Sequence, residues 1–185
     1  MAERPSSGVL TSAALWLGLI VAGGIGIWAT RPPRAADASA PPSVFSAARA
    51  MTHLAQIAKQ PHPIGSDEAV RVREYLVEQL RTLGAEVHVE QEVGTASHGR
   101  TLHAGLVNNI VATFPGRANS RALMLVAHYD SVPEGPGAAD DGAGLIVILE
   151  AVRALRARPP IKNDLIVLFS DGEEVGLLGA QAFTA

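Results

Sequence analysis

The chain has 185 residues, a formal net charge of -3 and no cysteine. A weakly acidic chain without a basic stripe, and with 4% aromatic residues, lacks the charged and stacking surface of a nucleic-acid-binding protein. The missing cysteines exclude disulfides and thiolate metal sites, but they leave the cellular compartment open.

An apolar segment follows a short amino-terminal tail, residues 1–8. Residues 9–30 carry no charge and are long enough for the hydrocarbon core of a bilayer, which predicts a transmembrane helix. A cleaved signal peptide is the rival interpretation. The apolar stretch is long for one, however, and Pro41 and Pro42 make a poor cleavage site. Arginines flank both ends, so the charge rule does not orient the helix.

The next segment, residues 31–42, is rich in proline and alanine and shows no periodicity, which predicts a stiff linker. We expect a folded domain over residues 43–185. Ser43 is the expected cap of its first helix, which would run to about Lys59.

A second helix is predicted after the break at Pro61-His62-Pro63. Ser66 is followed by two acids, and a hydroxyl cap with first-turn carboxylates satisfies the exposed amides at a helix start. The helix should end at Gly84. No chemical role is apparent for His62, for which we expect a structural one.

Strands and helices alternate along the rest of the chain. Alternating apolar and polar residues predict a half-exposed strand, and continuous apolar runs predict buried strands. The predicted strands are Val87–Val93, Leu106–Phe114, Ala122–Ala127 as a buried central strand, and Leu165–Phe169 as a second buried strand. Helices are predicted over Gly144–Leu155 and from Val175 onward. This order indicates an α/β domain with helices that cover a mixed sheet.

Acidic and imidazole side chains follow two of the apolar strands. His128 and Asp130 come at the exit of one, Asp140 lies just before the next helix, and Glu173 and Glu174 follow the other strand. Ligands of open α/β sheets bind at the carboxyl ends of the strands. Imidazole and carboxylate donors suit zinc, cobalt or manganese, and a carboxylate beside a metal ligand is typical of a general base. The pattern favours a metallohydrolase.

Each of these residues has a plainer interpretation when it is taken alone. One of the consecutive acids Asp140 and Asp141 could cap the helix, and adjacent glutamates are commonly solvated charges of a first helical turn. Together they favour a cation site, because buried strand ends rarely carry so many acids without one.

Three sequence blocks resemble the M28 zinc aminopeptidase family. They are HYDS from His128, PGAADDGAG from Pro136 and DGEEVGLLG from Asp171, in the order that the family has. The block PHPIGS from Pro61 is similar to the endoplasmic-reticulum and vacuolar membrane branch. The resemblance covers about residues 47–183 and implies an α/β/α sandwich with a mixed central sheet, the phosphorylase/hydrolase-like zinc peptidase fold.

The resemblance also implies a role for each site residue. His128 would bind one zinc ion, Asp140 would bridge two, and Glu174 would bind the second. Glu173 would be the general base, and Asp130 would orient the ring of His128. The implied protein is a membrane-bound aminopeptidase that acts on peptides, with its catalytic domain outside the cytoplasm.

Two further ligands of the family, an acid and a histidine, have no counterpart here, because every other histidine lies upstream of His128. We therefore expect an amino-terminal fragment with an incomplete peptidase domain that is inactive alone. Two alternatives stay open: a glutaminyl-cyclase-like acyltransferase with a single zinc, and a non-catalytic membrane scaffold of the same fold.

Overall fold

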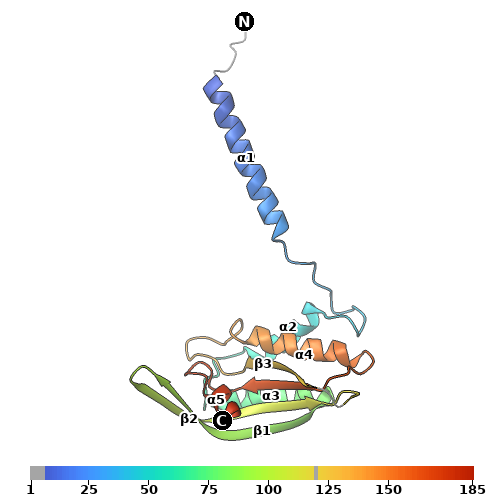
Figure 1. The fold of residues 1–185 in the computed structure, drawn as a ribbon, viewed down its shortest axis with the longest axis vertical. Coiled ribbons are helices and arrows are strands. Elements are labelled where there is room, and N and C mark those ends of the chain that lie inside the picture. Colours follow the sequence, from blue (N-terminus) through green and yellow to red (C-terminus); the bar gives the residue numbers. More distant parts are fainter. Residues whose placement is uncertain (1–6, 119–120) are drawn as a thin grey trace. The chain divides into compact units, whose positions relative to one another are not determined.

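The structure is a computed structural model that describes residues 7–118 and 121–185 (Figure 1). It divides into two compact units, and the boundary between them in the sequence falls between Arg34 and Ala35. The tail predicted at residues 1–8 falls largely outside the described residues.

The first unit contains one helix, α1 (Ser7–Ala29), where the apolar segment predicts one. Its stretch Ser12–Ala29 is long and apolar enough to cross a membrane. At about 1.5 Å per residue, the 23 residues of α1 extend over about 35 Å, which exceeds the hydrocarbon core of a typical bilayer.

The second unit is a mixed four-stranded sheet with helices. Its elements are α2 (Ala47–Ile57), α3 (Asp67–Thr82), β1 (Glu86–His98), β2 (Thr101–Phe114), β3 (Leu123–His128), α4 (Gly142–Arg156), β4 (Leu165–Ser170) and α5 (Leu178–Thr184). The strand order is β1-β2-β4-β3. The pairs β1–β2 and β2–β4 are antiparallel, whereas β3 and β4 are parallel. The predicted α/β class with a mixed sheet is confirmed.

Helices cover both faces of the sheet. Along β2, Ile110, Ala112 and Phe114 belong to the main core, which α2, α3 and α4 complete. Val107 and Asn109 point to the other face, because side chains alternate along a strand. Val107 packs there against Leu178 of α5. In Figure 1, α2 and α4 lie together over the sheet while α5 lies beside β1 and β2. This is the α/β/α arrangement that the resemblance implies.

The first helix of this unit begins later than predicted. The cap is Ser46, whose Oγ accepts a hydrogen bond from the backbone N–H of Arg49 at 3.2 Å. The N–H of Ser46 itself donates to Glu150 Oε1 at 2.8 Å. The prediction of Ser43 was wrong because a carboxylate about a hundred residues away fixes the helix start. The cap at Ser66 is confirmed, with Ala69 as its donor.

The hairpin of β1 and β2 is longer than the alternation of side chains predicts. The predicted strands stop at Val93 and Leu106, next to Gly94 and Gly105, which face each other in the register of the hairpin. A β-carbon on Gly94 would lie 2.5 Å from the carbonyl oxygen of Leu178. The glycines therefore interrupt the alternation of apolar and polar side chains, although both strands continue through them. The absence of a side chain at these positions leaves room for α5.

The strand β3 is not the buried central strand that its apolar run predicts. It pairs with β4 alone among the described residues, so it lies at an edge of this sheet. Leu123, Met124 and Val126 are 55%, 42% and 53% exposed. A continuous apolar run shows that neither face of a strand carries polar side chains. Whether other elements bury that strand depends on its position in the sheet. The buried strand predicted at residues 165–169 is confirmed as β4, between β2 and β3.

Part of the predicted linker is bound to the second unit. Arg49 donates to the carbonyl oxygens of Ala38 and Ala40 at 2.7 and 2.9 Å. Arg153 donates to Pro42 at 2.8 Å. We call residues 36–44 the docked segment. Both arginines are held in turn by Glu150, a fully buried carboxylate that contacts Arg49 Nε at 3.1 Å and Arg153 Nε at 2.6 Å. The predicted domain start at residue 43 stays a prediction.

Candidate metal centre

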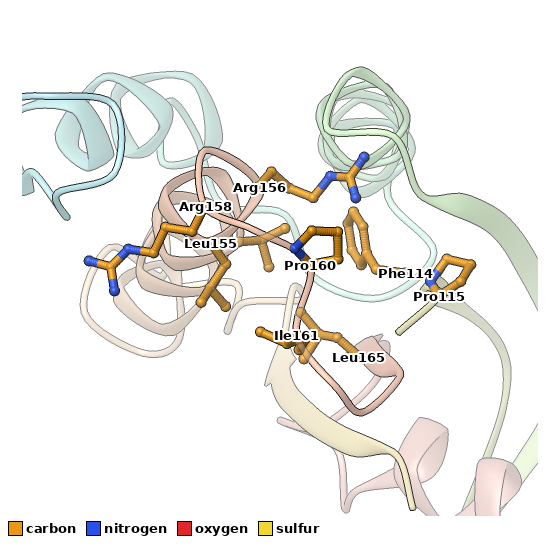
Figure 2. Close-up of a pocket in the computed structure, with 9 residues that line it drawn as sticks. Phe114, Pro115, Leu155, Arg156, Arg158, Pro160, Ile161 and Leu165 are labelled. Atoms are coloured by element: carbon orange, nitrogen blue, oxygen red, sulfur yellow. The ribbon is translucent and has the colours of Figure 1, made fainter. Parts of the chain in front are cut away.

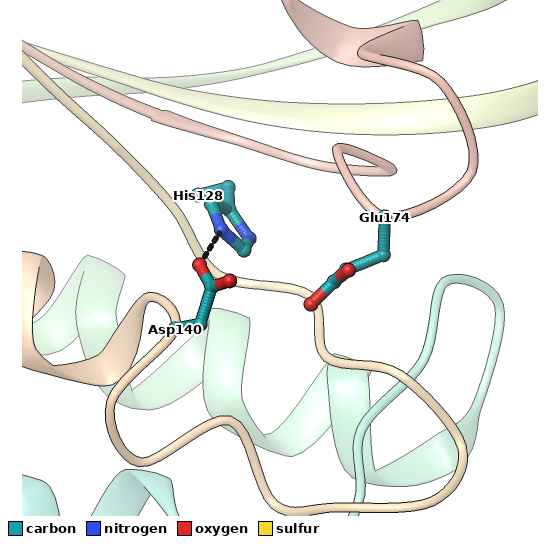
Figure 3. A group of neighbouring side chains, drawn as sticks. All are labelled: His128, Asp140 and Glu174. Atoms are coloured by element: carbon teal, nitrogen blue, oxygen red, sulfur yellow. Dashed lines mark hydrogen bonds and ion pairs between the residues drawn. The ribbon is translucent and has the colours of Figure 1, made fainter.

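Three side chains from separate elements converge at the carboxyl ends of β3 and β4 (Figure 3). His128 is the last residue of β3, Asp140 precedes α4, and Glu174 lies in the loop after β4. Each offers one possible ligand atom, and these atoms all lie within 4.8 Å of one another. His128 Nε2 is 3.0 Å from Asp140 Oδ1. Parallel β3 and β4 end side by side, so residues far apart in the sequence meet here.

The two consecutive aspartates have different environments. Asp141 caps α4, and its Oδ1 accepts a hydrogen bond from the N–H of Gly144 at 2.9 Å. The side chain of Asp140 is 83% exposed and faces His128. The peptide bond between the two aspartates is cis. The helix cap and the candidate metal ligand are thus separate residues.

Asp130 is buried directly behind the metal-facing groups. Its backbone carbonyl lies 3.0 Å from His128 Nδ1, and its carboxylate Oδ1 lies 3.5 Å from the same nitrogen. The carboxylate also accepts the backbone N–H groups of Glu173 and Glu174, at 3.0 and 3.1 Å. The side chain of Asp130 therefore links the imidazole ring to the loop after β4.

The site carries an excess of negative charge. Burial alone would lower the pKa of His128, but hydrogen bonds with Asp130 and Asp140 outweigh burial and raise that pKa to about 9. Burial raises the pKa of Glu174, and the nearby charge of Asp140 adds to the effect. Carboxylates that hold a proton on a buried imidazole would also stabilise a metal cation there. One imidazole and two carboxylates make a donor set that fits zinc.

Glu173 lies beside this trio without belonging to it. Its Oε2 is 3.9 Å from His128 Nε2, and its side chain is 36% exposed. A carboxylate in this position can reach a water molecule that also contacts a bound metal ion. This is the geometry expected of a general base.

Buried hydrogen bonds of the side chains of Asn109 and Asp171 fix the loop that carries both glutamates. We call this network the clip, and the sequence did not predict it. Asn109 Nδ2 donates to the carbonyl of Gly179 at 2.8 Å, while its Oδ1 accepts the N–H of Asp171 at 3.1 Å. Asp171 Oδ2 accepts the N–H of Asn108 at 3.0 Å. Burial raises the pKa of Asp171, whose Oδ1 has no hydrogen-bond partner within the described chain.

The helix predicted from Val175 begins only at Leu178. Gly176 and Leu177 have φ values of 115° and 62°, both in the left-handed region. Two such residues in succession cannot continue a right-handed helix, and only the glycine was a visible signal in the sequence. Glu173 and Glu174 therefore lie in a loop, not in a first helical turn.

A cavity of about 530 Å³ opens beside the two glutamates. It is bounded by the ends of β1 and β2, by residues 173–177 and by Gln181 of α5. A different cavity, of about 260 Å³, lies at the other end of α4 (Figure 2). Its lining includes Phe114 and Leu155 and, as polar side chains, Arg156 and Arg158. No acid or histidine lines it, whereas the lining of the first cavity includes Glu174, one of the three candidate metal ligands.

His62 lies behind the site and is almost fully buried. Its N–H donates to Ser131 Oγ at 2.8 Å, and its carbonyl accepts the N–H of Ser131 at 3.2 Å. Its ring Nδ1 lies 2.9 Å from the carbonyl of Gln60. These contacts hold the turn at Pro61-His62-Pro63 against the strand exit.

The α/β/α fold is shared with a Zn-dependent exopeptidase and with glutaminyl cyclases of known structure. Residues 109–185 match the sequence model of Peptidase family M28. The chain belongs to this family, as the three sequence blocks indicate.

Known proteins resemble the chain in sequence and in structure. A vacuolar membrane protease of Yarrowia lipolytica is 30% identical over 97% of this chain, and the chain spans 20% of that relative's length. A glutaminyl cyclase of Porphyromonas gingivalis has a TM-score of 0.64 and 29% identity, over 76% of this chain and 53% of that one. A Zn-dependent exopeptidase of Parabacteroides distasonis has a TM-score of 0.60 and 27% identity, over 71% and 48%.

Proposed function

We propose that the protein is a zinc-dependent aminopeptidase that hydrolyses the amino-terminal peptide bond of its substrates. The observation that carries this proposal is the convergence of His128, Asp140 and Glu174 within 4.8 Å, with Glu173 beside them. Membership of family M28 and the likeness to a Zn-dependent exopeptidase support it.

In this proposal His128, Asp140 and Glu174 would hold the metal, with two zinc ions expected in the complete site. Bound zinc supplies a Lewis acid that polarises the substrate carbonyl and lowers the pKa of water. Glu173 accepts a proton from the attacking water at its carboxylate and returns it to the leaving amine. Asp130 keeps the ring of His128 and the backbone of Glu173 in place through the contacts described above.

We further propose that α1 anchors the enzyme in a membrane and that the second unit acts on peptides outside the cytoplasm. The length and apolar composition of Ser12–Ala29 support an anchor. The relative from Yarrowia lipolytica is named as a membrane protease of the vacuole, which agrees with this assignment.

The deciding experiment measures zinc stoichiometry and the hydrolysis of leucyl-anilide by the full-length gene product. Glu173→Gln should abolish hydrolysis while zinc content stays unchanged, because the base does not hold the metal. Glu134→Gln, a change of an exposed acid in the loop between Asp130 and Asp140, is the matched control and should keep activity. Hydrolysis that survives in Glu173→Gln would overturn the assigned mechanism.

A glutaminyl cyclase is the second candidate, because the Porphyromonas gingivalis cyclase gives a TM-score of 0.64 with this chain. A peptide with amino-terminal glutamine separates the two reactions. Cyclisation releases ammonia and leaves the peptide bond intact, whereas an aminopeptidase releases free glutamine. Zinc binding without either product would indicate the non-catalytic scaffold.

A further inference from the structure

The two ends of the sheet in the second unit carry opposite charge. The loops at the metal end contain seven acids, four in residues 129–141 and three in residues 171–177, and no lysine or arginine. The loops at the other end, residues 115–122 and 157–164, contain one acid and four basic residues: Arg117, Arg121, Arg158 and Lys162. We call this second pair of loops the basic end. The six residues of β4 connect the two ends, which places them about 20 Å apart.

Hydrogen bonds join the two loops of the basic end into one surface. The backbone N–H of Arg117 donates to the carbonyl of Ile161 at 2.9 Å. The side-chain amide of Asn163 donates to the carbonyl of Arg121. Arg117, Arg121 and Lys162 are all exposed. Three exposed cations from two separate loops therefore lie on the same surface.

The three exposed cations are not used inside the second unit. Within the part of the chain that the structure describes, their side chains make no hydrogen bond and no ion pair. The one acid of these loops, Asp164, is half-buried, and its Oδ1 accepts the N–H of Gly116 at 2.7 Å. Glu86, at the start of the neighbouring strand β1, lies 3.2 Å from His88. The positive charge of the basic end is thus available to a partner outside the chain.

The basic end also presents apolar groups. The cavity of Figure 2 lies between its two loops and the last turn of α4, and its lining includes Pro115, Pro160 and Ile161. Exposed Arg156 lines the same cavity, and its guanidinium carbon is 6.0 Å from the centre of the Phe114 ring. A surface with cations around apolar groups suits the headgroup region of a bilayer, where both kinds of contact can be made.

The sequence next to α1 connects the basic end to a bilayer. Only residues 30–35 separate α1 from the docked segment, and they include Arg31 and Arg34 but no acid. Six residues extend over about 20 Å at most. Arg158 of the basic end donates to the carbonyl of Ser43 in the docked segment at 2.7 Å. A bilayer that holds α1 is therefore within reach of the second unit.

We infer that the basic end docks on a bilayer that carries anionic lipid headgroups, and that Arg117, Arg121 and Lys162 provide the attraction. In this orientation the metal centre lies at the far end of the second unit from the bilayer, where peptides in solution can reach it. The inference rests on the proposed anchoring by α1 and not on the aminopeptidase activity. Salt should weaken the docking, because exposed charges are screened beyond about 8 Å at physiological ionic strength.

Energy transfer from the full chain to labelled lipid headgroups tests this inference. Residues 1–185 contain no cysteine, so one introduced cysteine can carry a donor dye. Ala118→Cys places the dye at the basic end, and Glu134→Cys places it at the metal end, both at exposed positions. The vesicles are phosphatidylcholine alone or an equal mixture with phosphatidylglycerol. We expect about twofold more transfer from Ala118→Cys in the anionic vesicles, no such increase from Glu134→Cys, and loss of the increase in high salt.

Two double variants separate the basic end from the charge of the whole chain. Arg117→Gln/Lys162→Gln should abolish the increase and leave thermal unfolding unchanged, because neither side chain has a partner among the described residues. Lys59→Gln/Arg100→Gln is the matched control. It removes the same charge from two exposed positions outside the basic end, one after α2 and one in the turn between β1 and β2, and should keep the increase.

The outcomes separate the docking surface from the anchor. Equal transfer in both kinds of vesicle, or an increase that survives in Arg117→Gln/Lys162→Gln, would overturn the inference. A salt-sensitive dimer without such an increase would overturn it as well and assign the basic end to the acidic end of a second copy. If the chain floated only with anionic vesicles, and only with Arg117 and Lys162 present, the docking surface would be supported and the anchor refuted. Binding to neither kind of vesicle would refute both.

Discussion

The carboxylate Oδ1 of Asp130 accepts the backbone N–H of Glu173 at 3.0 Å, which joins the exit of β3 to the loop after β4. Its other oxygen accepts the N–H of Glu174 at 3.1 Å. One buried side chain thus sets the backbone of the proposed base and of a proposed metal ligand, and it also lies 3.5 Å from the ring of His128. Asp130 therefore links two of the candidate metal ligands, His128 and Glu174, without belonging to the donor trio itself.

Replacing this carboxylate should weaken the metal site. In Asp130→Asn, the amide nitrogen would face an N–H group of the glutamate loop, because an amide can offer only one acceptor atom where the carboxylate offers two. We expect zinc affinity to fall about 10- to 100-fold, as measured by competition with a chelator. An unchanged affinity would show that Asp130 does not hold the ligands in place.

Removing Asn109 should loosen the same loop from the other side. Asn109→Leu leaves the N–H of Asp171 and the carbonyl of Gly179 unpaired in a buried place, which should cost about 2 to 4 kcal/mol of unfolding free energy. Urea unfolding measures this cost. Gln91→Leu is the control, because Gln91 is an exposed amide of the neighbouring strand β1 whose side chain donates to Asn108 Oδ1 and not to Asp171 or Gly179. Equal losses in both variants would contradict the clip.

The buried carboxylate of Glu150 should make stability depend on pH. Burial would raise its pKa, but hydrogen bonds from Arg153, Ser46 and Arg49 outweigh burial and hold the pKa below the ordinary value of 4.5. Because the folded pKa is the lower one, this stabilisation is present above pH 4.5 and is lost as the pH falls through the folded pKa.

Two variants test this role of Glu150. At pH 7, Glu150→Gln should lower the unfolding free energy by about 3 kcal/mol, since it breaks a buried ion pair. Its stability should then vary less than that of the wild type as the pH falls below 4.5, because only the wild type has a paired carboxylate to protonate. Glu78→Gln, on the exposed face of α3, should follow the wild-type pH profile.

A methyl group at Gly94 should disturb the contact between the hairpin and α5. Its β-carbon would lie 2.5 Å from the carbonyl oxygen of Leu178, which belongs to backbone that cannot move without α5. We expect Gly94→Ala to destabilise the fold by about 1 to 3 kcal/mol in thermal unfolding. Gly135→Ala serves as control, because nothing lies within 4 Å of a β-carbon there. If Gly94→Ala left the thermal stability unchanged, the close contact between Gly94 and Leu178 would not be what holds α5 against the hairpin.

The sequence predicts the strand-end trio well because each member carries a local signal. His128, Asp140 and Glu174 each follow a recognisable strand or precede a recognisable helix, and parallel strands bring such ends together. Glu150 and Asn109 carry no such signal. In the sequence they look like an acid on a helix and an amide on a strand, because the partners that give them their roles lie about 60 to 100 residues away. The exposure of β3 was likewise invisible, because strand order is a property of the whole sheet.

The docked segment decides where a version of the chain without α1 should begin. A chain that starts at Ser43 would lack the carbonyls of Ala38 and Ala40, and Nη1 of Arg49 would lose both of these acceptors. It would also lack the carbonyl of Asp37, which accepts the hydroxyl of the helix cap Ser46 at 2.7 Å. A chain that starts at Ala35 keeps all of these contacts and omits the apolar helix, so this boundary is the one to choose for protein production.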